Sequence, residues 1–153
     1  MTNIVVLIKQ VPDTWSERKL SEGDWTLDRE AADAVLDEIN ERAVEEALLI
    51  KEREGGDSTV TVLTAGPARA TEAIRKALSM GADEAILVND PLLAGSDQQG
   101  IAHALAKTIQ KAGACDLILT GCESGDWADR AVPGFLAEEL EIGYVGYVTR
   151  IEM

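Results

Sequence analysis

The sequence predicts an α/β fold, namely a doubly wound, mostly parallel open sheet of about five strands with helices on both faces. Three observations predict it. Unbroken apolar runs recur along the chain, as in strands that are buried on both faces. Segments with apolar residues at every third or fourth position separate these runs. The length of 153 residues, of which 46% are hydrophobic, suits a single domain, residues 1–153.

The first expected strand, Asn3 to Lys9, is rich in β-branched residues and ends at the turn signal Lys9–Asp13. Similar runs follow, of which the last is the least clear: Ser58–Thr64, Glu84–Val88, Asp116–Thr120 and Tyr144–Ile151.

The expected helices lie between these strands. Apolar side chains step by three or four residues in four stretches, the last of which is less regular: Leu36 to Ile50, Ala70 to Leu78, Ile101 to Ile109 and Val132 to Leu140. Gly81 is expected to end the second helix, and the third is expected to end before Gly113.

The stretch from Thr14 to Ala34 breaks this rhythm. It is polar, carries Trp15 and Trp25, and is too long for an ordinary loop between a strand and a helix. We interpret it as a functional excursion or an arm that contacts a partner, and we expect it to be mobile in the isolated chain.

Charge and composition exclude several classes of function. The net charge of −14 repels phosphate backbones and anionic lipids, which disfavours nucleic acid and membrane surfaces as partners. Two cysteines and one histidine do not make a common zinc site, so no metal is expected. No signal peptide or apolar run of transmembrane length is present, and the expected compartment is the cytoplasm.

In a doubly wound sheet, ligands bind beyond the carboxyl ends of the strands, where the strand order reverses. Three strand-end loops are therefore candidates: Lys9–Asp13, Thr64–Pro67 and Thr120–Asp126. The third carries Gly121, Ser124 and Gly125 before a helix, an arrangement that can bind an anion or can be simple turn chemistry. It is not a Walker loop, and no Gly-x-Gly-x-x-Gly fingerprint follows the first strand.

Other polar residues have plainer interpretations. His103 and Cys115 are expected to be structural, and Cys122 lacks a cationic neighbour that would activate it. Asp126 and Asp129 fit helix caps, or alternatively ligands for ribose hydroxyls. No constellation predicts acid–base or nucleophilic catalysis, so no catalytic residue is assigned.

Several runs together resemble the β subunit of electron-transfer flavoproteins, in the same order along the chain. They are Ile4–Asp13, Asp37–Ala47, Thr64–Pro67, Ala73–Asp83, Ser96-Asp97 and Leu117–Gly121. The resemblance implies an adenine nucleotide alpha hydrolase-like fold. It also implies a heterodimer with an α subunit that holds most of one FAD. The heterodimer would carry electrons from acyl-CoA or other dehydrogenases. The β subunit of that family buries AMP as a structural ligand.

Carried over by position, the resemblance places AMP among the ends of the first, second and fourth strands. The implied contacts are Leu7, Ile8, Lys9, Asp37, Ala65, Gly66, Ser124, Asp126, Asp129, Arg130, Ala131 and Val132. The phosphate would lie on N–H groups at residues 129–132, and Arg130 is expected to pair with it.

Family members continue for roughly another hundred residues, the size of a further small domain. The chain is therefore expected to be a fragment or an abbreviated relative that lacks the C-terminal part. The alternatives are a freestanding adenine-nucleotide-binding module of the stress-protein type and a structural interaction domain with an empty pocket.

Overall fold

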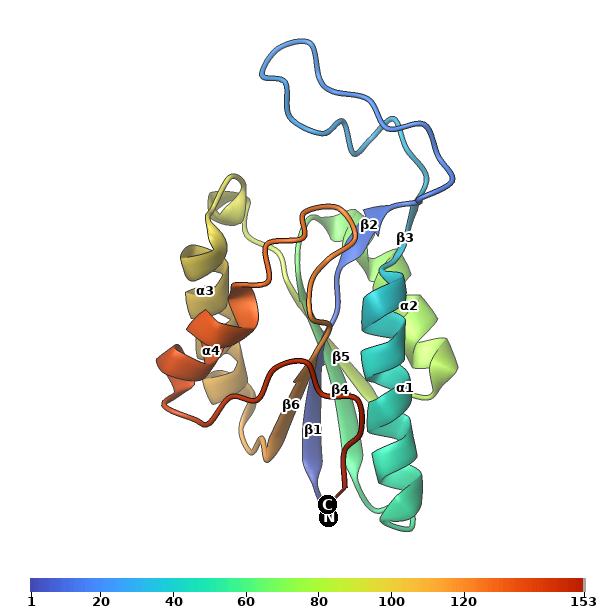
Figure 1. The fold of residues 1–153 in the computed structure, drawn as a ribbon, viewed down its shortest axis with the longest axis vertical. Helices are drawn as coiled ribbons and strands as arrows, with labels where there is room; N and C mark the ends of the chain where they lie inside the picture. Colours follow the sequence, from blue (N-terminus) through green and yellow to red (C-terminus); the bar gives the residue numbers. More distant parts are fainter. Residues whose placement is uncertain (153) are drawn as a thin grey trace.

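A computed structural model describes residues 1–152. Its centre is a four-stranded parallel sheet with helices on both faces (Figure 1). The strands are β1 (Asn3–Leu7), β4 (Thr59–Ala65), β5 (Glu84–Val88) and β6 (Leu117–Thr120). The helices are α1 (Glu38–Arg53), α2 (Thr71–Met80), α3 (Gln98–Ala112) and α4 (Val132–Leu140), with two 3₁₀ turns, η1 (Ala68–Ala70) and η2 (Pro91–Leu93). The predicted fold class is confirmed.

The strand order is β5-β4-β1-β6, so the chain builds outward from β1 in one direction and then returns to add β6 on the other side. At the centre of the sheet, Val6 lies opposite Val62 of β4 and Leu119 of β6. The carboxyl ends of β1 and β6 are therefore neighbours at the point where the order reverses, which is where ligands bind in such sheets.

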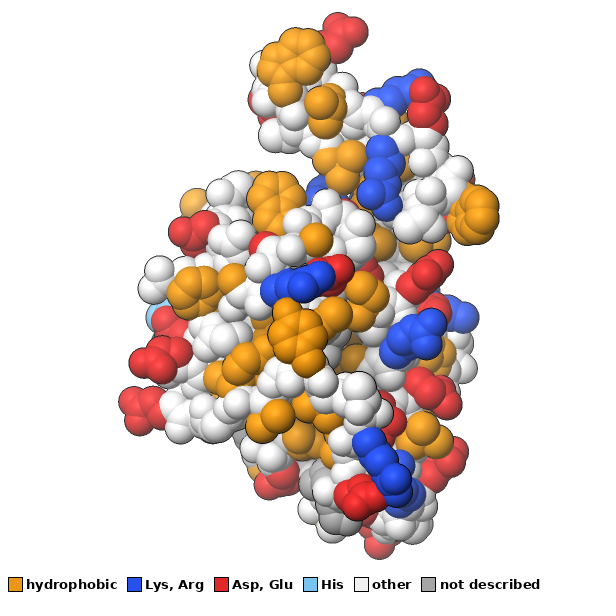
Figure 2. All heavy atoms as spheres, in the orientation of Figure 1, with side chains coloured by type: hydrophobic (Ala, Val, Ile, Leu, Met, Phe, Trp, Pro, Cys, Tyr) orange, Lys and Arg blue, Asp and Glu red, His pale blue; other side chains and the backbone are white. Residues whose placement is uncertain are grey.

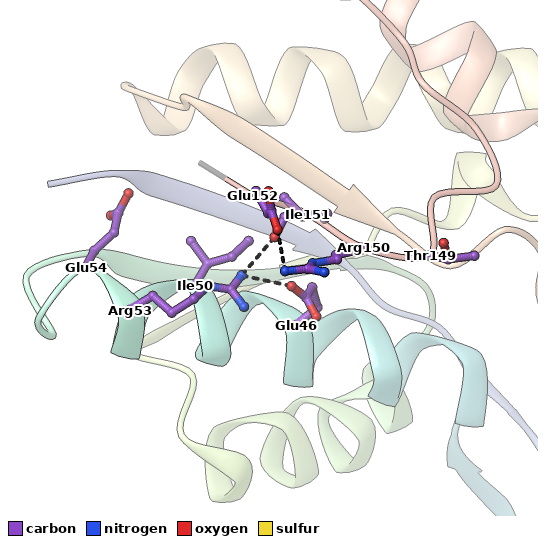
Figure 3. Close-up of a pocket in the computed structure, with 8 residues that line it drawn as sticks. All are labelled: Glu46, Ile50, Arg53, Glu54, Thr149, Arg150, Ile151 and Glu152. Carbon is purple, nitrogen blue, oxygen red and sulfur yellow. Dashed lines mark hydrogen bonds and ion pairs between the residues drawn. The ribbon is translucent and has the colours of Figure 1, made fainter.

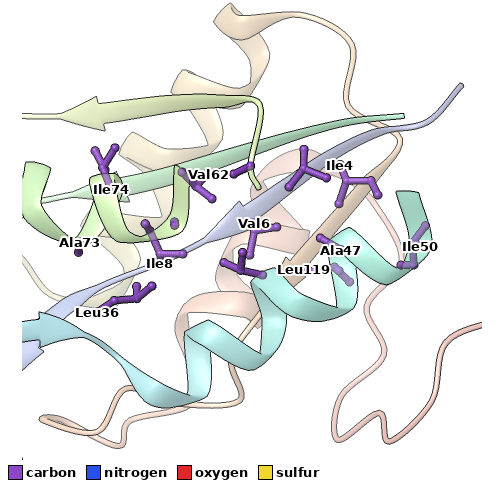
Figure 4. Close-up of a cluster of buried hydrophobic side chains, with 14 residues drawn as sticks. Ile4, Val6, Ile8, Leu36, Ala47, Ile50, Val62, Ala73, Ile74 and Leu119 are labelled. Atoms are coloured by element: carbon purple, nitrogen blue, oxygen red, sulfur yellow. The ribbon is translucent and has the colours of Figure 1, made fainter. Parts of the chain in front are cut away.

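Alternate residues of the strands supply two cores. Ile4, Val6 and Ile8 face α1 and α2 and belong to one buried cluster (Figure 4). Val5 and Leu7 face α3 and α4 and belong to the other. This burial on both faces explains why the strands are continuous apolar runs rather than alternating ones.

Short polar residues and glycines delimit the helices as predicted. The Asp97 carboxylate accepts a hydrogen bond from the Gly100 N–H at 2.8 Å and begins α3. Gly81 ends α2 with a φ of 125°, and Gly113 ends α3 with a φ of 114°. These positive φ angles cost glycine little, which confirms both helix ends.

The expected strand over Tyr144–Ile151 is wrong, because this segment forms no strand. Its side chains are exposed up to Arg150, and Ile151 then packs against the α1 side of the core. The residues from Thr149 to Glu152 lie beside α1 and line with it an open pocket of about 320 Å³ (Figure 3). Strand formation requires a backbone partner as well as suitable residues. Here β6 remains an edge of the sheet.

Residues 13–33 form the arm, a long loop that projects beyond the carboxyl edge of the sheet (Figures 1 and 2). Two short strands at its base, β2 (Gln10–Pro12) and β3 (Ala34–Leu36), pair antiparallel. Within the arm, Leu20 and Leu27 form an isolated antiparallel bridge. Trp15 and Trp25 are 92% and 71% exposed. The mobility of the arm stays a prediction.

Candidate functional site

The strongest polar cluster lies at the carboxyl ends of β1 and β6. The Lys9 ammonium, just beyond β1, donates to Asp126 Oδ1 at 2.9 Å and to Ser124 Oγ at 3.3 Å. Lys9 is thus more than a hundred residues from its partners in sequence, and the parallel sheet brings them together. Three residues that the sequence singled out for nucleotide binding form one contact group.

Asp126 is the buried centre of this cluster, with no side-chain exposure. Burial raises the pKa of its carboxyl, but the hydrogen bond and charge of Lys9, with contributions from Ser124 and Arg29, hold that pKa below its ordinary value. Arg29 Nη2 lies 2.6 Å from Asp126 Oδ2. Both oxygens of this carboxylate are therefore paired with a cation, Oδ1 with Lys9 and Oδ2 with Arg29.

The buried Asp37 carboxylate joins the start of α1 to the β6–α4 loop. Its Oδ1 accepts from the N–H groups of Ile39 and Asn40 at 2.8 and 3.2 Å, so Asp37 is the N-cap of α1. Its Oδ2 accepts from the Gly125 N–H at 2.6 Å. A Cβ at Gly121 would lie 2.5 Å from Asn40 Nδ2, which leaves no room there for a side chain. The loop is therefore fixed against α1 by one carboxylate and by close packing.

The loop after β4 offers space rather than charge. The Gly66 N–H donates a hydrogen bond to the Val88 carbonyl at 3.0 Å. A Cβ built on Gly66 would have no neighbour within 4 Å other than Ala70. Ala65 is half-buried beside it. The hydroxyl of Thr64 is buried and has no hydrogen-bond partner. This orphaned hydroxyl lies at the carboxyl edge of the sheet, near the end of β4.

Leu7 and Ile8 are buried in the two opposite cores. Their side chains are therefore unavailable to a ligand at the strand ends, and any contact there would come from the backbone.

The start of α4 has a strained backbone. Ala128 and Arg130 have φ angles of 57° and 59°, in the left-handed region that non-glycine residues rarely adopt. The Asp129 carboxylate accepts from the Ala131 N–H at 3.1 Å, and Val132 begins the helix. One of the N–H groups expected to hold a phosphate, that of Ala131, is thus already bonded to a carboxylate, and no side chain caps α4.

Arg130 does not lie with the Lys9 cluster. Its guanidinium pairs with Glu123 and donates to the Tyr147 hydroxyl at 3.3 Å, above whose ring it lies. These contacts raise the pKa of Arg130 above its already high ordinary value. Arg130 would have to leave Glu123 to bind a phosphate at the strand ends.

Arg29 and Asn40 take part in the site without having been predicted. Arg29 lies in the arm, where no periodic pattern relates it to the sheet, and Asn40 looks like an ordinary polar residue in the first turn of a helix. His103, by contrast, is exposed and pairs with Glu139 at 2.9 Å, which ties α3 to α4.

The pocket in Figure 3, and a second of about 280 Å³ between β3 and α2, contain no residue predicted to bind AMP. Within the described residues, no three His, Cys, Asp or Glu side chains are arranged to hold a metal ion.

Comparison with known proteins decides the family. Residues 24–153 match the family described as "Electron transfer flavoprotein domain". The chain belongs to this family. The "Electron transfer flavoprotein subunit beta" of Mycobacterium tuberculosis is 58% identical over all of this chain. The protein of the same name from Thermoanaerobacterium thermosaccharolyticum is 42% identical over 99% of the chain. The "Caffeyl-CoA reductase-Etf complex subunit CarD" of Acetobacterium woodii is 37% identical over 98%.

The chain spans less than two thirds of these family members. It covers 59% of the mycobacterial relative, 56% of the Thermoanaerobacterium one and 56% of CarD. The resemblance read from the sequence is thereby confirmed at the level of the family. No helix within residues 1–152 has both the length and the apolar character needed to cross a membrane.

Proposed function

We propose that this chain is the nucleotide-binding part of an electron-transfer flavoprotein β subunit. In this role it pairs with an α subunit that holds most of one FAD, and the pair carries electrons from acyl-CoA or other dehydrogenases without catalytic residues of its own. The observation that carries the proposal is the match of the whole chain to relatives named as β subunits. FAD supplies the electron-transfer chemistry, and this chain contributes the surface and the folded support for it.

We place a structural AMP at the carboxyl ends of β1, β4 and β6. Lys9 would meet its phosphate, Gly66 would leave room for the adenosine, and Ser124 would offer a hydroxyl at the same edge. The orphaned hydroxyl of Thr64 at this edge supports a polar ligand there, because buried polar groups usually have partners. The cytoplasm is the proposed compartment, which two free cysteines suit.

Co-expression with a candidate α subunit tests the carrier role. We expect a complex that shows flavin absorbance, whereas this chain alone is expected to be colourless. A complex without flavin, or no complex, would contradict the proposal.

Calorimetry with AMP tests the nucleotide site. We expect wild type to bind and Gly66→Val to lose binding, because the added side chain would occupy the open space at the strand end. A Cβ there lies 3.4 Å from the Ala70 Cβ, an ordinary contact, so the variant should fold. Gly143→Val is the matched control, since a Cβ at Gly143 meets nothing within 4 Å. Equal affinity of the two variants would remove the β4 loop from the site.

A further inference from the structure

The returning limb of the arm lies across the carboxyl edge of the sheet. Arg29 reaches Asp126 in the loop after β6. The next residue, Glu30, pairs with Arg69 Nη1 at 3.0 Å, in the turn after β4. The same Arg69 nitrogen donates to the Arg29 carbonyl at 2.9 Å. Two consecutive residues of the arm are therefore attached to loops from both sides of β1.

Two cationic side chains share the carboxylate of Asp126. One fully buried carboxylate is shared by Lys9 and Arg29, whose side chains remain 39% and 42% exposed. With the buried Asp37 carboxylate beside the same loop, the formal charges balance, so a phosphate would be bound by individual N–H donors of Lys9 and Arg29. Because both side chains stay partly exposed, they remain accessible to a ligand at this edge.

We propose that Arg29 is a clasp between the arm and the nucleotide site. It holds the arm across the strand ends, and together with Lys9 it binds the phosphate of the nucleotide. If the phosphate holds Arg29 in the position that also holds the arm, nucleotide binding favours closure of the arm, and by linkage closure favours binding to the same extent. The phosphate half of this inference rests on the proposed AMP site, whereas the arm half does not.

The proposed tie between Arg29 of the arm and Asp126 can be tested without nucleotide by chymotrypsin cleavage at Trp15 and Trp25. This protease cleaves after aromatic residues, so the substitution of Arg29 does not itself remove a cleavage site. We expect the arm of Arg29→Ala to be cut about five-fold faster than that of wild type, because its tie to Asp126 is lost. The control Arg18→Ala removes the same charge from the arm and should be cleaved at the rate of wild type. Arg29→Lys keeps a cation beside Asp126 and should be cleaved at nearly that rate. Circular dichroism verifies that each variant is folded. Equal cleavage of Arg29→Ala and Arg18→Ala would overturn the clasp.

Calorimetry with AMP and with adenosine tests the phosphate half. We expect Arg29→Ala to bind AMP about ten-fold more weakly, the usual effect of losing one charged hydrogen bond, and to bind adenosine as wild type does. AMP should also slow chymotrypsin cleavage of the wild-type arm and leave that of Arg29→Ala unchanged. An equal loss of affinity for AMP and adenosine would show a merely structural role, and faster cleavage with AMP would overturn mutual stabilisation.

The two levels of proposal fail differently. If wild type binds neither AMP nor adenosine, the AMP site and the phosphate half are both wrong, while the cleavage rates without nucleotide still decide the arm half.

Discussion

Asp37→Ala removes a carboxylate that bonds two parts of the chain at once. Loss of the α1 cap should cost about 0.5–2 kcal/mol in the free energy of unfolding. Loss of the bond from the Gly125 N–H to the charged Oδ2 should cost about 1.5–3 kcal/mol more. The total of about 2–5 kcal/mol is a large fraction of the stability of a domain of this size.

Asp97→Ala is the matched control. Asp97 caps α3 through the Gly100 N–H and is exposed, so its removal should cost only the cap, about 0.5–2 kcal/mol. Asp37→Asn should keep the cap of α1, because asparagine is an equally good N-cap. It should still lose the charged bond to Gly125 and therefore fall between wild type and Asp37→Ala.

Urea unfolding followed by far-ultraviolet circular dichroism measures these differences. Tryptophan fluorescence is the wrong probe, because Trp15, Trp25 and Trp127 are 92%, 71% and 64% exposed and lie outside both cores. If Asp37→Ala and Asp97→Ala lose the same stability, the bond between Asp37 and the loop contributes nothing and the reasoning fails.

Three further predictions concern the same loop. Gly121→Ala should destabilise the fold by about 1–3 kcal/mol, since the Cβ would meet Asn40 Nδ2 at 2.5 Å and Ile39 Cγ2 at 2.9 Å. The control Gly134→Ala in α4 meets no atom within 4 Å and should stabilise the fold slightly. The urea midpoints of unfolding of the two variants test this difference. Folding lowers the pKa of Asp126, so the ionised carboxylate stabilises the fold fully above the unfolded pKa of about 3.9. This stabilisation is lost as the pH falls below that value. The thermal midpoint of Asp126→Asn should therefore drop less steeply below about pH 4 than that of wild type. Arg130→Ala should leave the affinity for AMP within about two-fold of wild type, because Glu123 and Tyr147 already bind its guanidinium; a loss of ten-fold or more by calorimetry would show that Arg130 moves to the phosphate.

The apolar strands were predictable because burial on both faces leaves a direct mark on the sequence. Val6, Val62 and Leu119 belong to runs that could fit little else than a buried parallel sheet. Tyr144–Ile151 has a similar composition, yet it forms no strand, because pairing depends on whether a partner backbone is in reach. The short strands β2 and β3 were not predicted, because a strand of three residues leaves almost no hydrophobic pattern in the sequence.

The site was predictable in position and less so in roles. The topology of a doubly wound sheet was enough to select Lys9, Gly66 and Ser124. Asp37 was expected to contact AMP, and in the structure its oxygens accept from the backbone of α1 and of the loop. Arg29 could not be found, because its contact with Asp126 depends on how an irregular loop folds back over the sheet.

The unpaired edge at β6 has a consequence for how the isolated chain is handled. An unpaired strand edge is a template onto which another chain can add, and Tyr144, Val145 and Tyr147 add exposed apolar surface in the segment after α4. Repulsion between chains of net charge −14 opposes such aggregation. That repulsion reaches about 10 Å at 0.1 M salt and about 3 Å at 1 M. Solubility should therefore be best in dilute buffer at neutral pH, and high salt or a pH near 4.4, where the net charge vanishes, should bring strand edges into contact.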